Sequence, residues 1–206
     1  GEQTVELDYK AVHIALLYAL ESLPLDADAY VIDGHKDKRS TFKAICLTLV
    51  NTEKLSSLQA NVTRSANPKV KEAFKTYTDK RQRYEYLRAL KLKATEPSKP
   101  KSLQGFINNI PSGSSGSELL QIIMEHHHPI AHYFGTEHIG LRLQKLDSEL
   151  MANALTKLQG IPCLPVHDSI RCKVSDMALV TNAMMDAYRE LHGQNIIVED
   201  DLPKRN

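Results

Sequence analysis

The chain has 206 residues, of which 42% are hydrophobic and 25% charged, a composition typical of a globular protein with a sizeable core. It contains no apolar run of about 18 residues and no basic-apolar leader, so neither a membrane span nor a signal peptide is predicted. The formal net charge of +1 hides an asymmetry, because residues 61–102 contain twelve Lys or Arg and four Asp or Glu. This basic segment suits a phosphate backbone as partner, although a solvated lysine-rich helix pair gives the same pattern.

The first predicted elements are a strand and a buried helix. Residues 4–9 alternate apolar and polar side chains, which is typical of a half-buried strand, and they end in Asp8-Tyr9. The apolar run 11–20 predicts a largely buried helix directly afterwards. His13 lies five residues beyond Asp8, in the first turn of that helix. A histidine in this setting is commonly a packed structural group, and its nearness to Asp8 makes it a candidate site residue.

The segment 36–51 predicts a helix with two cations on one face. Arg39 and Lys43 are four residues apart, so both side chains project from the same side of the helix. Two stacked cations suit a triphosphate, with Arg forking onto oxygens and Lys acting as a point charge. Surface solubility would produce the same spacing. The opposite face can pack inward through Phe42, Ile45, Cys46 and Leu49.

Three further helices are predicted between about residues 53 and 93. Tyr77, Tyr84 and Tyr86 interleave with basic residues there, a mixture that can follow a nucleic-acid backbone and stack on its bases. Residues 95–102 read as a linker. Residues 112–117, Ser-Gly-Ser-Ser-Gly-Ser, predict a flexible loop without a function of its own.

A histidine-rich stretch follows a predicted helix near residues 118–127. Four histidines within residues 126–132 invite a zinc hypothesis, but Pro129 separates the pair at helical spacing and no metalloprotease Glu follows. Packing or phosphate contact is therefore favoured. A long helix carrying Arg142 and Gln144 is predicted next, to about residue 158. Three cysteines, an odd number without metal-ligand spacing, indicate reduced thiols in an intracellular protein.

The segment 162–173 predicts a β-hairpin, because two short strand-like runs flank the polar residues His167-Asp168-Ser169. Its tip presents the carboxylate of Asp168 on a rigid platform. Asp8 also stands at the end of a strand, so the two carboxylates together suggest one metal site. A helix over 177–191 and a strand over 196–198 complete the chain.

The order of these motifs resembles the palm and fingers of family A DNA polymerases and single-subunit phage-type RNA polymerases. Glu6-Leu-Asp8-Tyr9 resembles motif A, Arg39-x-x-x-Lys43 resembles motif B, and His167-Asp168-Ser169 resembles the RNA-polymerase form of motif C. The stretches Pro-Ile-Ala-His-Tyr-Phe-Gly and Leu-Pro-Val-His-Asp-Ser are similar to small phage and prophage proteins. The resemblance implies a cytoplasmic protein of a bacterial or phage-infected cell.

The resemblance also implies an α+β fold, in which a small antiparallel palm-like sheet carries a largely helical, fingers-like insertion. Residues 1–34 would form the first part of the palm, 35–117 the insertion with its basic segment and flexible loop, and 118–206 the second part of the palm. Because the chain starts at motif A, a partner chain or a preceding segment would supply the thumb.

The implied activity is template-directed nucleotidyl transfer with two Mg²⁺ or Mn²⁺ ions. Asp8, Asp168 and the backbone carbonyl of Tyr9 would bind the metals. Arg39 and Lys43 would cradle the nucleoside triphosphate, and His167 would position the primer end. The partners would be primer-template DNA or RNA and nucleoside triphosphates. Residues that would contact nucleotide or nucleic acid are Tyr9, His13, Asn51, Arg142, Gln144 and Ser169.

The chain departs from the family pattern at several positions. Asn51 stands where an aromatic residue would stack on the new base pair, Thr52 replaces a glycine, and His13 occupies the sugar-gate position. One alternative is therefore a palm-derived nucleic-acid-binding protein whose catalysis is weak or lost. Another is an unrelated phosphate-handling or structural protein. The polymerase hypothesis requires the Asp8 and Asp168 carboxylates to lie about 4–6 Å apart across adjacent strands.

Overall fold

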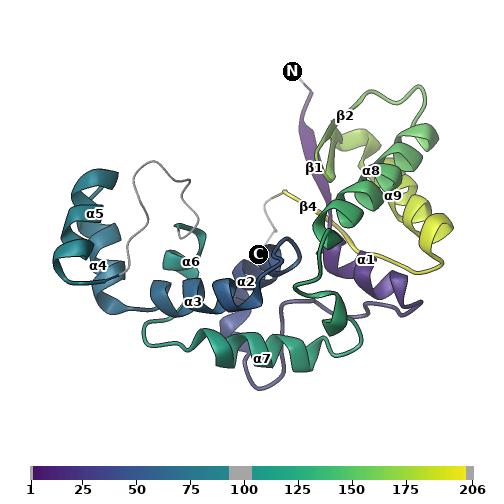
Figure 1. The fold of residues 1–206 in the computed structure, drawn as a ribbon. Coiled ribbons are helices and arrows are strands. Elements are labelled where there is room, and N and C mark those ends of the chain that lie inside the picture. The colour runs from purple at the N-terminus through teal and green to yellow at the C-terminus, as the bar shows by residue number, and fades with distance from the viewer. Residues whose placement is uncertain (1, 93–103, 203–206) are drawn as a thin grey trace. The chain divides into compact units, whose positions relative to one another are not determined.

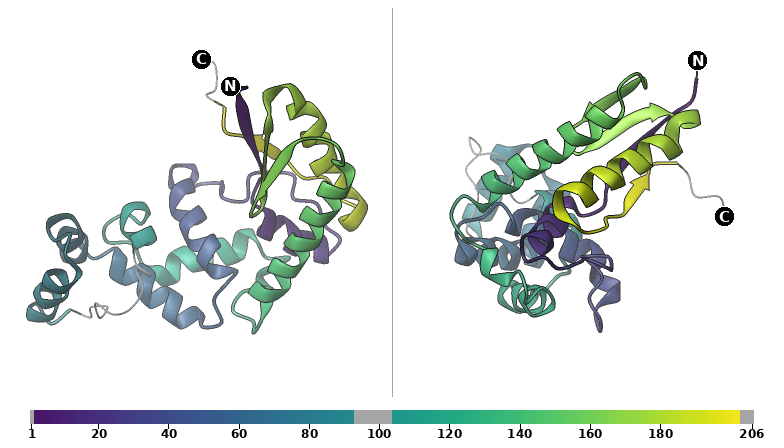
Figure 2. Two further views of the ribbon diagram at one scale, coloured as in Figure 1. Left: turned by 90° about the horizontal axis from the view of Figure 1, so that it is seen from above. Right: turned by 90° about the vertical axis from the view of Figure 1, so that its right-hand side faces the viewer.

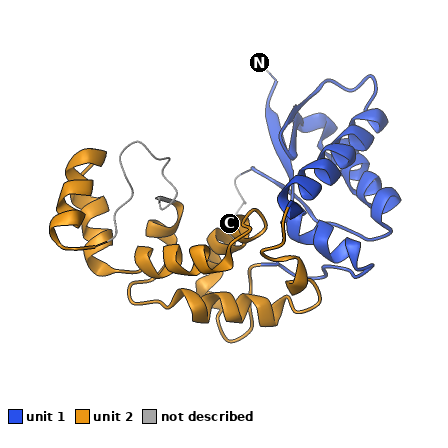
Figure 3. Cartoon of the chain, in the orientation of Figure 1, with its two compact units in different colours: residues 1–29, 138–206 blue, residues 30–137 orange. Residues whose placement is uncertain are grey.

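The computed structural model describes residues 2–92 and 104–202, and it is an α+β protein (Figure 1). The predicted linker over 95–102 lies outside the described residues. The chain divides into two compact units (Figure 3). Unit 1 comprises residues 1–29 and 138–206, and unit 2 comprises residues 30–137. Residues 118–137, which the sequence assigned to the second palm segment, thus belong to unit 2.

Unit 1 contains a small open antiparallel sheet with the strand order β2-β3-β1-β4. Strand β1 pairs with both β3 and β4, and β2 forms a hairpin with β3, as the sequence predicted. The last strand begins two residues later than expected. The strands are β1 (Thr4–Tyr9), β2 (Cys163–Val166), β3 (Ser169–Lys173) and β4 (Val198–Asp200).

Three helices of unit 1 pack together, and one of them lies against the sheet (Figure 2). They are α1 (Val12–Leu20), α8 (Ile139–Lys157) and α9 (Met177–His192), the last preceded by the 3₁₀ turn η3 (Val174–Asp176). Helix α9 contacts β1 and β3, and both α1 and α9 pack against α8. The alternation of β1 places every second side chain in this core. The strand residues that are at most 2% exposed there are Val5, Leu7, Tyr9, Ile170 and Cys172.

Unit 2 is helical throughout its described residues. Its helices are α2 (Arg39–Leu49), α3 (Leu55–Ser65), α4 (Pro68–Thr76), α5 (Lys80–Ala89), α6 (Gln104–Asn109) and α7 (Gly116–His126), with the 3₁₀ turns η1 (Lys36–Lys38) and η2 (Ala131–Tyr133). Helix α2 packs against α3, α6 and α7. The apolar face predicted for α2 is confirmed, because its four inward residues are at most 1% exposed. Across residues 2–92 and 104–202, no helix is long and apolar enough to cross a membrane.

The loop predicted over residues 112–117 ends at Ser115, because Gly116 and Ser117 already belong to α7. Ser115 is the N-cap of α7, and its hydroxyl accepts a hydrogen bond from the backbone N–H of Glu118. The N–H of Gly116 donates to Thr63 Oγ1 of α3 at 2.9 Å. The sequence does contain the signal for this helix start, since Ser115-x-x-Glu118 has the spacing of a capping box. The Ser/Gly composition suggested only a loop, but a helix begins within this segment and its first residue contacts α3.

Candidate functional site

Strands β1 and β3 bring the two predicted acidic residues to neighbouring positions in unit 1. Asp8 is the cross-strand partner of Ser169, and Asp168 directly precedes Ser169. Opposed Cα atoms in an antiparallel pair are about 4.5–5.5 Å apart, and consecutive Cα atoms about 3.8 Å. The Cα atoms of Asp8 and Asp168 therefore lie within about 9 Å of each other. This backbone spacing makes Asp8 and Asp168 neighbours at one end of the β1–β3 pair.

A two-residue turn holds Asp168. Val166 pairs with Ser169, so only His167 and Asp168 form the loop of the β2–β3 hairpin. Such tight hairpins need a positive φ in the loop, and His167 has a φ of 56°. Histidine is one of the few non-glycine residues that adopt this conformation with some frequency. The turn thus exposes the imidazole of His167 beside the half-buried Asp168.

Asp8 lies on the sheet face opposite the helices, together with Glu6 and Ser169. Side chains alternate between the two faces of a strand, and Val5 and Leu7 point into the core together with their partners on β3. Glu6 and Asp8 therefore point to the other face. Glu6 accepts a hydrogen bond from Ser169 Oγ at 2.9 Å and forms an ion pair with Arg171. The Arg171 guanidinium, and next the Ser169 hydroxyl, lower the pKa of Glu6. Glu6 therefore stays ionised and bound to its own partners, and Ser169 braces β1 against β3.

A third carboxylate, which the sequence did not single out, lies near this site. Burial, followed by the negative charge of Asp168, raises the pKa of Asp147 on α8, while His13 acts in the opposite direction. Burial and then Asp147 also raise the pKa of Tyr9, whose hydroxyl donates to the carbonyl of Met184 at 2.8 Å. Asp147 Oδ1 is buried and has no hydrogen-bond partner among the described residues. Asp147 is thus electrostatically coupled to three of the predicted site residues.

A sequence signal for Asp147 existed. The buried side of α8 carries residues at helical spacing, with Leu143 four positions before Asp147 and Leu150 three positions after it. A carboxylate in such an apolar stripe is costly unless a partner or a function compensates it. By contrast, Arg142 and Gln144 are exposed on α8, and His13 is half-buried in the first turn of α1.

The donor set suits a hard cation that keeps part of its water shell. Among residues 2–92 and 104–202, no group of three or more His, Cys, Asp or Glu side chains is arranged to hold a metal ion. Mg²⁺, however, is typically bound by one or two carboxylates together with water and substrate phosphates, not by a complete protein cage. Asp8 and Asp168 supply two such carboxylates at adjacent positions. As oxygen donors, the two carboxylates are compatible in type with Mg²⁺ that keeps further ligands from water or phosphate.

The histidine-rich stretch of unit 2 makes several ring contacts. His127 is fully buried, with its ring 4.7 Å from that of His126 and 6.5 Å from that of Phe134. The rings of His132 and Tyr133 lie 4.1 Å apart. These contacts agree with packing, one of the two roles that the sequence favoured for these histidines.

Arg39 and Lys43 share one face of α2, as predicted. Both cations lie over the ring of Tyr30, at 5.8 and 6.0 Å from its centroid. They border a pocket between α2 and α6, where Thr41 Oγ1 donates to the carbonyl of Asn109 at 2.6 Å and holds the two helices together. The other lining residues are Ser40, Ala44, Leu47, Thr48, Gly105, Phe106 and Asn109. The pocket thus combines two cations with an apolar wall.

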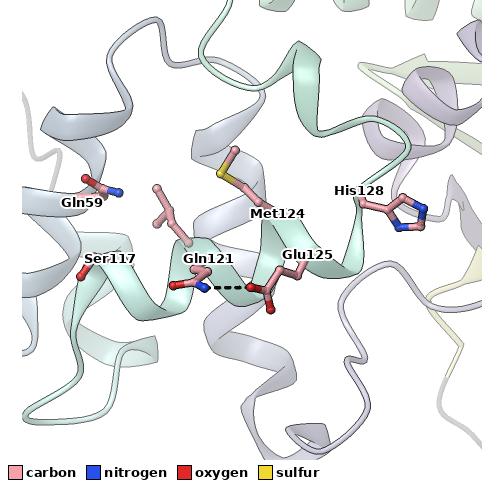
Figure 4. Close-up of a pocket in the computed structure, with 7 residues that line it drawn as sticks. Gln59, Ser117, Gln121, Met124, Glu125 and His128 are labelled. Atoms are coloured by element: carbon pink, nitrogen blue, oxygen red, sulfur yellow. Dashed lines mark hydrogen bonds between the residues drawn. The ribbon is translucent and has the colours of Figure 1, made fainter.

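Asn51 lies beyond the end of α2, and its amide nitrogen donates to the carbonyl of Leu47 at 3.2 Å. Its side chain therefore satisfies a carbonyl of the last helical turn, which an aromatic residue could not do. A second pocket of unit 2 lies along α7, where Gln121 Nε2 donates to Glu125 Oε1 at 2.8 Å (Figure 4). None of the predicted site residues lines that second pocket.

The fold and these two groups of residues define a two-unit α+β protein with paired carboxylates in one unit and paired cations in the other. A scan against models of protein families finds no match to the chain, and no curated protein aligns with it significantly.

Proposed function

We propose that the chain is a template-directed nucleotidyltransferase, in which unit 1 is a polymerase-like palm and unit 2 its fingers-like insertion. The observation that carries this proposal is the register of β1 and β3, which makes Asp8 and Asp168 neighbours on antiparallel strands. If the chain contains motifs A and C, Asp8 and Asp168 must be neighbours in the fold, although they are far apart in the sequence. An unrelated fold would produce it only by coincidence.

In this proposal Asp8, Asp168 and the carbonyl of Tyr9 hold two Mg²⁺ or Mn²⁺ ions, which when bound supply activation of the primer hydroxyl and neutralisation of phosphate charge. The residues of the chain itself position the reactants. The ion pair Glu6–Arg171 joins β1 to β3 two residues away from Asp8. His167 is exposed on the hairpin tip and would donate a hydrogen bond to the phosphate of a primer end.

Arg39 and Lys43 bind the triphosphate in this proposal, with Tyr30 holding both cations at the same pocket. Replacing Arg39 or Lys43 by Gln is expected to lower kcat/KM for the nucleotide by about 10- to 150-fold, because a hydrogen bond to a charged group contributes about 1.5–3 kcal/mol. Steady-state incorporation of single nucleotides measures this effect.

Lys36→Gln is the matched control, because it removes one exposed positive charge from the same unit at the turn before α2. We expect Lys36→Gln to change kcat/KM by less than about 2-fold, since exposed charges are strongly screened by salt. Equal losses in all three variants would contradict a specific triphosphate site and indicate a bulk charge effect.

The direct test is primer extension on labelled primer-template, with dNTP or NTP pools, in the presence of Mg²⁺, Mn²⁺ or EDTA. We expect addition that follows the template sequence, requires a divalent metal and stops in EDTA. The preferred pool identifies the sugar that the His13 position accepts. Absence of any addition with both metals and both pools would contradict the proposal.

A second candidate is a palm-derived nucleic-acid-binding protein without efficient catalysis. Asn51 favours it, because its amide is bound to the carbonyl of Leu47 at a position where the family stacks an aromatic ring on the new base pair. Such a protein would bind nucleic acid equally well in EDTA and would not extend a primer. The primer-extension assay therefore separates the two candidates.

A further inference from the structure

Helices α4 and α5 form a basic hairpin at one end of unit 2 (Figure 1). Residues 68–92 contain eight Lys or Arg and three Asp or Glu. Asp79 caps α5 by accepting hydrogen bonds from the N–H groups of Arg81 and Gln82. This cap stabilises the first turn of α5, from which Arg81 projects.

The packing of the hairpin separates its aromatic residues into two groups. Tyr77 and Tyr86 pack on each other, with ring centroids 5.1 Å apart. Phe74 packs under Arg83, whose guanidinium lies 4.0 Å from the ring centroid and which is only 9% exposed. These contacts hold α4 and α5 together. Two of the three tyrosines that the sequence associated with nucleic acid, Tyr77 and Tyr86, are therefore engaged in packing within the hairpin.

The third tyrosine lies on a different face of α5. Arg81, Tyr84 and Arg88 have the spacing i, i+3 and i+7, so they lie in a row along one side of the helix. Both arginines are exposed and Tyr84 is half-buried. We call these three residues the α5 platform. An aromatic ring between two guanidinium groups combines a stacking surface with two phosphate donors.

The platform can exchange its internal contacts for a ligand at little cost. Arg81 Nε is 3.4 Å from Glu85 Oε1, and the two side chains are 82% and 64% exposed. An ion pair this exposed contributes less than about 1 kcal/mol. A phosphate can therefore replace Glu85 as the partner of Arg81 without a large loss of stability.

We propose that the α5 platform binds single-stranded nucleic acid, with backbone phosphates on Arg81 and Arg88 and one base stacked on Tyr84. Single strands fit better than duplexes, because the flat face of a base is free for an aromatic ring only when that base has left the duplex stack. This inference rests on the proposed function, because a template-directed nucleotidyltransferase must hold a single-stranded template. Binding is nevertheless measured without metal or nucleoside triphosphate.

Fluorescence anisotropy of a labelled homopyrimidine oligonucleotide, in EDTA and over a range of NaCl concentrations, tests the platform in the full chain. Tyr84→Leu is expected to weaken binding about 5- to 150-fold, the usual effect of losing one base–aromatic stack, while Tyr84→Phe retains it. The double variant Arg81→Gln/Arg88→Gln should reduce the slope of log K against log[NaCl] by about 1.4, because each phosphate contact to a single strand contributes about 0.7.

The double variant Lys69→Gln/Lys75→Gln is the matched control, since it removes the same charge from exposed positions of α4. It should bind more strongly than the α5 double variant. Wild-type affinity in Tyr84→Leu, equal losses in both double variants, or preference for a duplex of the same sequence would each overturn the inference. Because binding is measured in EDTA and without nucleoside triphosphate, a wild type that fails to extend a primer still tests the platform, and the two failures remain distinguishable.

Discussion

Asp168→Asn is expected to lower the rate of metal-dependent nucleotide incorporation by about 10³-fold or more and to leave the fold intact. Asparagine keeps the size of the side chain but removes the negative charge that would hold a divalent cation at the hairpin tip. A bound metal contributes several kcal/mol to the transition state of phosphoryl transfer, and about 4 kcal/mol corresponds to 10³-fold in rate. Single-turnover primer extension with saturating Mg²⁺ measures the loss.

The same variant has a second readout that does not depend on activity. Because burial and the charge of Asp168 raise the pKa of Asp147, ionised Asp147 destabilises the folded state. Protonated Asp147 avoids this penalty, and its contribution to stability is full below the pKa that Asp147 has in the unfolded chain. The contribution is lost as the pH rises through the higher pKa that Asp147 has in the folded protein. Asp168→Asn relieves part of this repulsion, so in EDTA its Tm should exceed that of the wild type at pH 7. The difference should vanish in acid.

Asp186→Asn is the matched control for both readouts. It makes the same substitution in unit 1 and removes only an exposed ion pair with Arg189. We expect it to retain activity and to change the free energy of unfolding by less than about 1 kcal/mol. If Asp168→Asn kept more than a tenth of wild-type incorporation, the carboxylate pair would not be the metal site. If its Tm fell sharply, the role of Asp168 would be structural.

Gly116→Ala is expected to destabilise the protein by about 1–3 kcal/mol, although alanine normally favours a helix over glycine. A Cβ atom at Gly116 would lie 2.2 Å from the backbone oxygen of Gln59 and 2.8 Å from Thr63 Oγ1. The first of these is a main-chain atom of α3 and can move away only if α3 and α7 separate. For a protein of this size the corresponding decrease in Tm is about 2–4 °C per kcal/mol. Thermal unfolding followed by circular dichroism measures it.

Gly105→Ala serves as the opposite control. Gly105 is also helical and in unit 2, but a Cβ atom there would meet nothing within 4 Å. Alanine should therefore stabilise α6, by up to about 1 kcal/mol. A decrease of Tm in Gly105→Ala, or wild-type stability in Gly116→Ala, would show that the close approach of α7 to α3 does not limit the packing of unit 2.

The sequence alone determined the elements with strong local patterns. The alternation of residues 4–9 placed Asp8 at the end of a strand, and the runs around His167-Asp168 predicted the hairpin that β2 and β3 form. The spacing of Arg39 and Lys43 correctly predicted that both cations share a face of α2. Each of these signals depends on a few neighbouring residues, because side-chain direction repeats with the period of the strand or helix.

Only the tertiary structure decided which distant residues meet. The pairing of Asp8 with Ser169 is a contact between the two ends of the chain, which no local period encodes. The approach of Asp147 to Asp168 follows from the packing of α8, and the contact of Tyr77 with Tyr86 singles out Tyr84 as the ring of the α5 platform. The Ser/Gly segment was predicted as a loop through Ser117, whereas α7 begins at Gly116 in contact with α3. Burial and long-range pairing are properties of the whole chain, so local patterns could not determine them.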